Sequence, residues 1–539
     1  MKIIRLLLVI TVSLAFFAFA VSSCSNREDP LAGQSTINRA LSTEPESLDP
    51  QKSRSVQALD VLRDIGEGLV AYSASGELIA ATAASWEISE DGLTYTFHVR
   101  PGARWSNGDP VMAQDFVSGL QRLVDPQTAA FYAAELSNVA NAAAIVAGDM
   151  PVTALGVEAI DDATLVISLL RPTPYLLSLL THPSTFPVHR GSVAEHGDGF
   201  ARAGKLLSNG AYVLVDWQPG SIIELRRNEH YWNNANTAID VVRHHIVTQE
   251  MAEVNRYRAG ELHTTSTVPP DNFDQLRTEY ADELHIAPTL GVYYYGFNLT
   301  KPPFKDNPAL RRALSMAIDR EVLVEAITGR GEAPAYSWVP PGIENYGPPR
   351  LSYADLSQDE RNALARSLYK EAGYSEANPL RFELRYNTSD TQQRIALAVQ
   401  AMWRDVLGVE ATPVNVEFQV LLDQMRDAEV TEVFRSSWFG DYNDANTFLA
   451  IMQSGSPGNM PRYANEEYDT LMKSASEQLD LDRRRLYLEE AERVLLADHA
   501  VIPLYFYVSK HLVSPEVGGW EDNILNYHYS QYLSLDAAE

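Results

Sequence analysis

The sequence VFRSSWFGDYNDANTFLAIM, at residues 433–452, joins a strand-like segment to a helix-like segment. Residues 433–439 alternate bulky and small side chains, a pattern that is typical of a short β-strand. The Asn and Asp residues within 443–446 are typical of a helix N-cap, and an apolar run at 448–452 follows them. The sequence therefore predicts that Asp441 lies in a turn between a strand and a helix.

Asp441 has aromatic neighbours in the sequence, with Trp438 and Phe439 before it and Tyr442 after it. These neighbours predict a carboxylate that is partly removed from water and needs a cationic partner, because an unpaired buried charge is costly. The alternative is that Asp441 is a turn or N-cap residue with no binding role, since aspartate favours both positions.

The composition indicates a large, acidic, globular protein. The chain has 539 residues, 45% of them hydrophobic, so it can bury extensive cores and is long enough for two or three domains. Its formal net charge is −28. Nucleic acids and anionic membrane surfaces require basic patches on their partners, so this charge argues against both.

The N-terminus predicts export and lipid attachment. Lys2 and Arg5 precede an apolar run at 6–20, which is too short to cross a bilayer comfortably and is typical of a signal peptide. Cys24, the single cysteine, ends the sequence Val-Ser-Ser-Cys, which resembles the lipidation site of bacterial lipoproteins. We therefore expect a lipoprotein signal peptide at residues 1–23 and no internal disulfide. The alternative is a plain signal peptide with an incidental cysteine.

Strand-like and helix-like segments alternate along the chain. Residues 93–100 alternate apolar and polar side chains after the turn residues 90–92, which predicts a β-hairpin with residues 86–88. Further along, the strand-like residues 380–386 precede an amphipathic segment at 394–406. Such alternation predicts an α/β protein with layered sheets and helices.

Residues 85–116, SWEISEDGLTYTFHVRPGARWSNGDPVMAQDF, carry a specific resemblance. They resemble the shared block of the family-5 extracellular solute-binding proteins, which capture peptides, nickel or haem for ABC importers. The resemblance covers residues 37–533. Later segments resemble the oligopeptide-binding branch of that family in the same order, namely residues 124–128, 182–185, 209–212, 231–234, 254–258, 293–295, 301–304, 386–390 and 517–519.

The resemblance implies a fold and its domain boundaries. The fold would be α/β, the two-lobed periplasmic-binding-protein clamp of type II, with an additional domain inserted in the first lobe. Hinges between the lobes would lie near residues 293–295 and 505–507. The implied boundaries are a first lobe built from residues 24–68, 191–292 and 509–539, an inserted domain at 69–190 and a second lobe at 293–508.

The resemblance also implies how a ligand is held. A protein that binds peptides of many sequences must recognise their cationic amino end, their anionic carboxyl end and their backbone N–H and C=O groups, the last by strand addition. By resemblance, the strand edges are residues 53–56 in the first lobe and 435–439 in the second. Asp441 matches the family's carboxylate for the ligand's α-ammonium group.

Four further residues match positions of the family's ligand site. Arg435 matches an arginine that meets the ligand carboxylate, in keeping with the planar guanidinium. Tyr132 matches a tyrosine at the amino end, with an ordinary core aromatic as the alternative. Trp438 is either the floor of the cleft or core. Arg426 is one position out of register with a second family arginine, and the alternative is a solvated surface charge.

The site also departs from the family pattern. Gln392 replaces a histidine, Thr328 a lysine, and Arg54 and Gly296 each replace a glutamate. These changes alter the charges around the site and leave the preferred peptide length and side chains open. The residues that we expect to bind the peptide are Asp441, Arg435, Tyr132, Trp438, Ser437, Phe439, Val56, Arg54, Arg426 and Gln392.

The sequence contains no pattern of a catalytic or metal site. It has no Gly-x-Ser-x-Gly elbow, His-Glu-x-x-His motif or phosphate loop, which argues against an enzyme. His244 and His245 are adjacent and would point to opposite faces of a strand, so we expect structural roles for both and neither a metal nor a cofactor.

The sequence thus predicts a monomeric periplasmic lipoprotein, anchored through Cys24, that closes two lobes around a short peptide and presents it to an ABC permease. Within the family, the alternatives are a cell-wall peptide, a dipeptide or haem as the ligand. The rival from another class is an exported peptidase, for which the sequence supplies no nucleophile–base pair or metal site.

Overall fold

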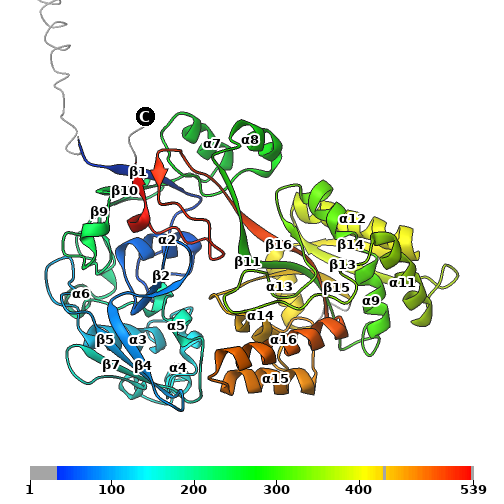
Figure 1. The fold of residues 1–539 in the computed structure, drawn as a ribbon, viewed down its shortest axis with the longest axis horizontal. Helices are drawn as coiled ribbons and strands as arrows, with labels where there is room; N and C mark the ends of the chain where they lie inside the picture. Colours follow the sequence, from blue (N-terminus) through cyan, green and yellow to red (C-terminus); the bar gives the residue numbers. More distant parts are fainter. Residues whose placement is uncertain (1–32, 429–431, 536–539) are drawn as a thin grey trace, which may run out of the picture.

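The computed structural model describes residues 33–428 and 432–535 and has two α/β lobes (Figure 1). The described residues form three larger β-sheets, and each sheet has its own hydrophobic core. The predicted signal peptide and Cys24 lie outside the described residues. Within the described ranges, no helix combines the length and the apolar character that a bilayer-spanning segment needs.

The first sheet forms the core of the first lobe. β1 is parallel to β10, and the other neighbours are antiparallel. The apolar side of α2 packs on this sheet, through Leu59, Leu62 and Ile65. The strands, in spatial order, are β1 (Thr36–Leu41), β10 (Val241–Ile246), β9 (Ile222–Arg227) and β8 (Tyr212–Gln218), and the helices are α2 (Val56–Ile65), α6 (Arg190–His196), α7 (Glu250–Arg258) and α8 (Phe273–Glu279).

The second sheet is antiparallel and forms the inserted domain. The predicted hairpin is confirmed, since β4 and β5 pair around a turn in which Gly92 has a φ of 67°. Phe116 and Leu120 of α3 pack on Tyr95 and Phe97 of β5. The elements are β4 (Ala83–Ile88), β5 (Thr94–Val99), β7 (Thr164–Ser168) and β6 (Val157–Ala159) in spatial order, the hairpin β2 (Val70–Tyr72) and β3 (Leu78–Ala80), and the helices α3 (Ala113–Val124), α4 (Ala142–Val146) and α5 (Leu176–Leu179).

The third sheet is mixed and forms the second lobe. Its strands, in spatial order, are β12 (Ala333–Pro334), β16 (Val501–Leu512), β11 (Leu284–Phe297), β15 (Val433–Phe439), β13 (Arg381–Asn387) and β14 (Glu410–Val416). Its helices are α9 (Pro308–Met316), α10 (Arg320–Val322), α11 (Gln358–Glu371), α12 (Asp390–Leu407), α13 (Phe418–Arg426), α14 (Asn446–Leu449), α15 (Glu466–Glu477) and α16 (Leu481–Asp498). The short strands β17 (Val517–Gly518) and β18 (Ser534–Leu535) pair near the C-terminus.

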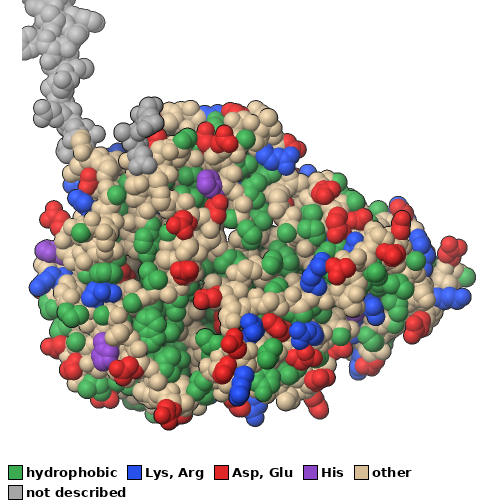
Figure 2. Space-filling model, in the orientation of Figure 1, with side chains coloured by type: hydrophobic (Ala, Val, Ile, Leu, Met, Phe, Trp, Pro, Cys, Tyr) green, Lys and Arg blue, Asp and Glu red, His purple; other side chains and the backbone are tan. Residues whose placement is uncertain are grey.

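The long antiparallel pair of β11 and β16 runs from the region of α7 and α8 into the second lobe (Figure 1). The register of the pair shifts between Pro288 and Val292. This irregularity lies just before the predicted hinge at 293–295, although the hinge positions and the domain boundaries remain predictions. The surface is hollowed where the two lobes meet, and acidic side chains are spread over both of them (Figure 2).

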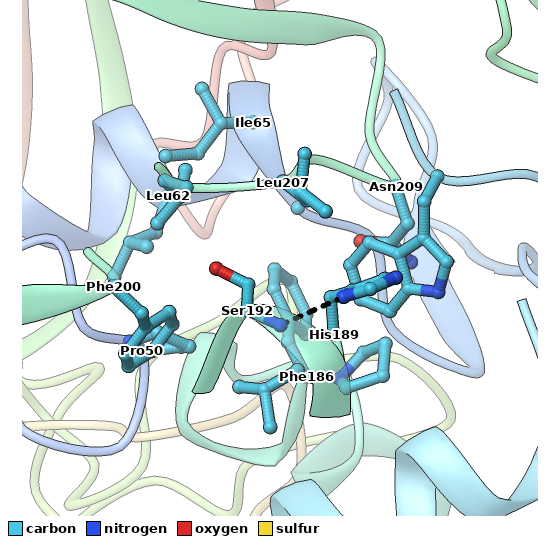
Figure 3. A pocket seen from close by; sticks show the side chains of 14 residues that line it. Pro50, Leu62, Ile65, Phe186, His189, Ser192, Phe200, Leu207 and Asn209 are labelled. Atoms are coloured by element: carbon cyan, nitrogen blue, oxygen red, sulfur yellow. Dashed lines mark hydrogen bonds between the residues drawn. The ribbon is translucent and has the colours of Figure 1, made fainter. Parts of the chain in front are cut away.

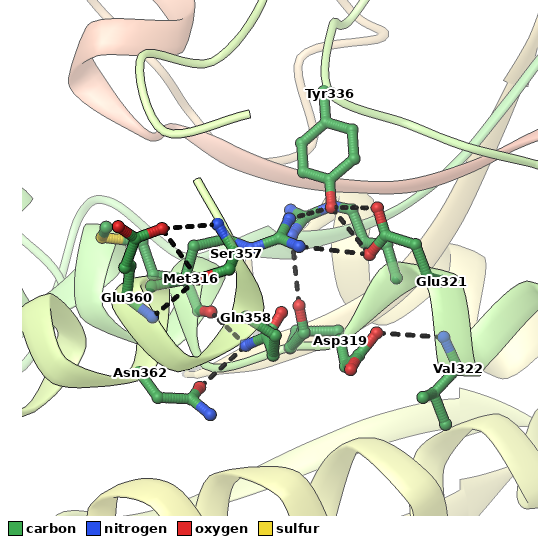
Figure 4. Close-up of polar contacts among 12 residues, drawn as sticks. Met316, Asp319, Glu321, Val322, Tyr336, Ser357, Gln358, Glu360 and Asn362 are labelled. Carbon is green, nitrogen blue, oxygen red and sulfur yellow. Dashed lines mark hydrogen bonds and ion pairs between the residues drawn. The ribbon is translucent and has the colours of Figure 1, made fainter. Parts of the chain in front are cut away.

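A polar network holds the helices that lie behind the third sheet. The Tyr336 hydroxyl donates to the Glu321 carboxylate at 2.7 Å, and the buried Arg361 guanidinium lies 3.3 Å from the same carboxylate (Figure 4). Ser357 and Glu360 form a capping box at the start of α11, in which each side chain accepts the other residue's N–H. These contacts hold the start of α11 and the segment around Tyr336 beside α10.

The prediction of a strand edge at residues 53–56 is wrong for Val56 and stays a prediction for residues 53–55. Ser55 is the N-cap of α2, and Val56 is the first residue of that helix. The Glu46 carboxylate accepts the backbone N–H groups of both Arg54 and Ser55. The helix start excludes Val56 from a strand edge, whereas the backbone of Ser55 is extended, with φ −74° and ψ 147°.

Candidate functional site

Strand β15 has one open edge. β11 pairs with it along its full length. On the other side, in the described part of the chain, β13 pairs only with Val433 and Phe434. Residues 435–439 therefore leave backbone donors and acceptors unpaired along one edge, to which a ligand strand can bond.

Arg435 lies at the start of this open segment, among tyrosines. Its guanidinium carbon is 5.1 Å from the centre of the Tyr293 ring, and its Nη2 is 3.5 Å from the Tyr507 hydroxyl. Its Nε is buried without a hydrogen-bond partner, and no carboxylate of the described residues forms an ion pair with it. A partly buried guanidinium without an anion is suited to bind a carboxylate.

The side chains of β15 divide between two faces. Ser437 and Phe439 share a face with Arg435, and Phe439 is 52% exposed, with its ring 4.7 Å from that of Tyr507. Trp438 is on the other face, where it packs against the core of the second lobe and leaves its Nε1 buried without a partner. The open edge thus presents a cation, a hydroxyl and an exposed ring at alternate positions.

Gln392 reaches the same region from the first turn of α12. Its Oε1 accepts a hydrogen bond from the Tyr293 hydroxyl at 2.5 Å. The ring of Tyr293 lies beside the Arg435 guanidinium, so the Tyr293 side chain links Gln392 to Arg435.

Asp441 lies in the turn between β15 and α14, as the sequence predicts. Its N–H donates to Thr447 Oγ1 at 3.1 Å, and that hydroxyl lies 3.4 Å from the Asp441 carboxylate. The side chain is open to solvent but has protein on several sides, so partial desolvation raises the pKa of the carboxyl group, while the Thr447 hydrogen bond lowers it. The expected cationic partner is not found among the described residues.

Two residues of the inserted domain lie close enough to Asp441 for its charge to affect them. Burial and the charge of Asp441 raise the pKa of Tyr132 to about 12 and that of Glu135 to about 7. Tyr132 packs on the core of the inserted domain, with its ring 4.2 Å from the His182 ring. The structure thus brings Tyr132 to Asp441 and adds Glu135, which no sequence pattern singled out.

Three predicted residues lie apart from this group. Arg426 is exposed and forms an ion pair with Asp423 at 3.2 Å, in keeping with a solvated surface charge. Arg54 and Val56 are exposed residues of the first lobe, and no hydrogen bond or ion pair of the described residues joins their side chains to the second lobe.

The inserted domain also contacts the second lobe beside Asp441. The Tyr175 and Tyr442 rings are stacked, with centroids 5.2 Å apart and planes 5° from parallel. Arg484 binds both Asp444 oxygens, at 2.7 and 2.8 Å, and its guanidinium lies 5.9 Å from the centre of the Tyr175 ring. We call these four residues the inter-lobe contact. Three of them, Tyr175, Asp444 and Arg484, also line a groove of about 280 Å³ between the inserted domain and the second lobe.

Two cavities next to α2 are too small for a peptide. The apolar cavity in Figure 3 lies between α2 and the inserted domain and is lined by Leu62, Ile65 and Phe186 among others. Its volume of about 30 Å³ has room for about one water molecule. A polar cavity of about 100 Å³ in the first lobe is lined in part by His244 and holds no more than a few waters.

The adjacent histidines have separate structural partners. His244 Nε2 lies 3.2 Å from the Asp64 carboxylate, and His245 Nε2 lies 2.9 Å from Asn38 Oδ1. Across the part of the chain that the structure describes, no group of three or more His, Cys, Asp or Glu side chains is arranged to hold a metal ion.

Comparison with known proteins decides the family. The family model of the bacterial extracellular solute-binding proteins, family 5 Middle, matches residues 77–460. The chain belongs to this family. Among relatives of this family-5 protein, the periplasmic oligopeptide-binding protein OppA of Escherichia coli is 39% identical over 91% of this chain and 90% of its own length. The periplasmic murein peptide-binding protein MppA and the probable deoxycholate-binding protein YgiS, both of Escherichia coli, are each 37% identical and cover 96% and 94% of this chain and 95% of their own lengths.

Solved structures confirm the two-lobed type II clamp. The unliganded open form of MppA matches with a TM-score of 0.86 at 36% identity, over 93% of this chain and 98% of that chain. Haemophilus influenzae OppA in complex with the peptide RPPGFSPFR matches with a TM-score of 0.75 at 37% identity, over 94% and 99%. Since the identities are nearly equal, the higher score indicates that the lobes of this family-5 protein are arranged as in an open form. The relatives are named as binding proteins, which confirms that the chain is not an enzyme.

Proposed function

We propose that this family-5 protein captures short peptides by adding them as a strand to the open edge of β15 and delivers them to the permease of an ABC importer. One observation carries the proposal. The Arg435 guanidinium and the Asp441 carboxylate lie at the two ends of one open strand edge, and neither has an ionic partner among the described residues. A short peptide offers the complementary carboxylate, ammonium and backbone amides. The peptide-binding names of OppA and MppA support the same ligand class.

The positions of the two charges imply the direction and length of the peptide. With its amino end at Asp441 and its carboxyl end at Arg435, the peptide runs antiparallel to β15. The seven positions from 435 to 441 are six steps apart and span at most about 20 Å of extended chain, which limits the peptide to roughly six residues.

Capture proceeds by closure of the lobes. A peptide on β15 gains its contacts with Arg54 and Val56 of the first lobe only when the lobes approach, so the ligand favours the closed state. Closure removes water from Asp441, which is exposed in the open form, and strengthens its interaction with the ammonium group. Val56 would contribute a side-chain contact rather than part of a strand edge.

The proposed subcellular location of the protein is based on its N-terminal sequence. We propose a periplasmic monomer anchored through Cys24, with the domain boundaries predicted from the sequence. The periplasmic names of the relatives support the compartment.

A bile-acid-like ligand is the second candidate, because a relative is named as a probable deoxycholate-binding protein. Such a ligand has a carboxylate for Arg435 and apolar rings for the exposed Phe439. However, it would leave the Asp441 carboxylate without a cation. A cell-wall peptide, a dipeptide and haem stay as alternatives within the family.

Calorimetric titration with tripeptides tests the proposal. Asp441→Asn and acetylation of the peptide's amino end should each weaken binding by about 3 kcal/mol or more, because each leaves one charge without its partner. Acetylation should have little further effect on Asp441→Asn, since both changes remove one interaction. Asp423→Asn, which alters an exposed acid of the same lobe, is the matched control.

The proposal is wrong if wild-type protein binds free and acetylated peptides equally. Binding of deoxycholate without binding of any tripeptide would favour the second candidate instead.

A further inference from the structure

We propose that Glu135 makes the site selective for peptides whose first residue is lysine or arginine. This inference rests on the proposed peptide site and adds a side-chain preference to it.

Glu135 projects from the same turn as Tyr132. It lies in the short helix η1 (Ala133–Leu136), and its N–H donates to the Tyr132 carbonyl at 3.1 Å. Its carboxylate is half-buried and forms no hydrogen bond or ion pair with any residue of 33–428 or 432–535. A carboxylate in such surroundings is stabilised by a cation that a ligand brings.

Asp441 gives the site a second negative charge. The α-ammonium group of a peptide neutralises one of the two carboxylates and leaves the other unpaired. Burial, and then the charge of Asp441, raise the pKa of Glu135 to about 7. The other titratable groups that act with Glu135 are the hydroxyls of Tyr132 and Tyr442, which bring no positive charge.

Two arginines of the first lobe and the inserted domain, Arg63 and Arg171, have other partners. Arg63 acts on Tyr132 from the first lobe, but its guanidinium pairs with Asp60 at 3.0 Å and lies 3.5 Å from the centre of the Tyr527 ring. Arg171 donates from its Nε to Asn138 at 2.7 Å. Neither of these arginines forms an ion pair with Glu135, so the second positive charge has to come from the ligand.

An aromatic surface beside Glu135 suits a long cationic side chain. Phe131 is 64% exposed, and its ring lies 5.0 Å from that of Tyr132, which in turn packs on His182. The aliphatic stem of lysine or arginine can lie along these rings while its charged end reaches the carboxylate. A neutral aromatic first residue would cover the rings but leave Glu135 unpaired.

Two tripeptides that differ only in this charge test the inference. Lys-Ala-Ala and norleucine-Ala-Ala have side chains of similar length, and their α-ammonium groups titrate alike. At pH 8 the wild-type protein should bind the lysine peptide more tightly, on the order of tenfold, and Glu135→Gln should remove the difference. Glu158→Gln, which alters an exposed acid of the inserted domain, is the matched control and should retain it.

The pH dependence separates a charge effect from a change in shape. Since the pKa of Glu135 is raised to about 7, its carboxylate is ionised above that pH, so the preference should be present at pH 8 and reduced at pH 6. Equal binding of the two peptides by wild-type protein at pH 8 would overturn the inference, and so would a lysine preference that survives Glu135→Gln. If neither peptide binds at all, the proposed peptide site itself is wrong.

Discussion

Arg435 and Arg426 belong to neighbouring elements of the second lobe but lie in opposite environments. Arg426 is exposed and paired with Asp423 at 3.2 Å, an arrangement that contributes little stability because water and salt screen it. Arg435 is surrounded by tyrosines and forms no ion pair with the described residues. A cation kept without an anion in the free protein has its charge available for a ligand carboxylate.

Arg435→Gln should weaken the binding of a free tripeptide by about 2 kcal/mol, or roughly 30-fold, because a charge-assisted hydrogen bond is lost. The same substitution should hardly affect a tripeptide whose carboxyl end is amidated. Titration calorimetry with both peptides measures the difference, and Arg426→Gln serves as the control with an exposed arginine. An equal loss for the free and amidated peptides would show that Arg435 has only a structural role.

At the scale of elements, the two edges of β15 differ in how far they are paired with neighbouring strands. β11 pairs with the whole strand, whereas β13 pairs with its first two residues and continues beside β14. Proteins usually protect an exposed strand edge against unwanted pairing. In this protein, residues 435–439 leave one edge of β15 unpaired among the described residues, and our proposal assigns that edge to the ligand.

A ligand that binds by strand addition depends on its backbone amides. Replacing one central amide of a tetrapeptide by an ester removes a single N–H donor, which should lower the affinity by about 1 kcal/mol if that donor faces β15. Moving the ester by one position should change the loss, because alternate N–H groups of a strand point to opposite sides. Tetrapeptides with the ester at successive positions, titrated against the wild-type protein, check this pattern. If every ester bound as well as the parent peptide, backbone pairing would be excluded.

At the scale of the whole molecule, the contacts between the two lobes include the long β11–β16 pair and the inter-lobe contact, in which Tyr175 stacks on Tyr442. Because Tyr442 follows Asp441 directly, this contact keeps the inserted domain beside the amino-end anchor even in an open arrangement. The amino-end half of the site is therefore already assembled before the lobes close.

Tyr175→Ala should allow the ligand-free protein to open further, because the ring stack contributes about 0.5–1.5 kcal/mol. Small-angle X-ray scattering should give a larger radius of gyration than wild type without peptide and the same radius with saturating peptide. Tyr280→Ala, which removes a ring paired with Tyr257 inside the first lobe, should leave both radii unchanged. An unchanged ligand-free radius for Tyr175→Ala would show that the stack does not limit opening.

Several features follow from the sequence because they depend on neighbours within a few residues. Alternation of side chains defines β15 and the β4–β5 hairpin, and the Asn/Asp-rich turn places Asp441 between a strand and a helix. The strand edge expected from resemblance at residues 53–56 is wrong for Val56, because the bonds from Glu46 and the Ser55 cap favour a helix start there. Local hydrogen bonds decide the conformation there.

Other features are decided only by the tertiary structure. The open edge at 435–439 exists because β13 separates from β15 after two residue pairs. No local sequence pattern predicts where two strands separate. Glu135 lies near Asp441, and Tyr175 stacks on Tyr442, because distant segments pack against each other. The sequence by itself determined the type of many elements, since these depend on residue type and spacing, and its resemblance to the family gave the expected ligand class. Which charges stay unpaired and lie near one another was decided by long-range packing.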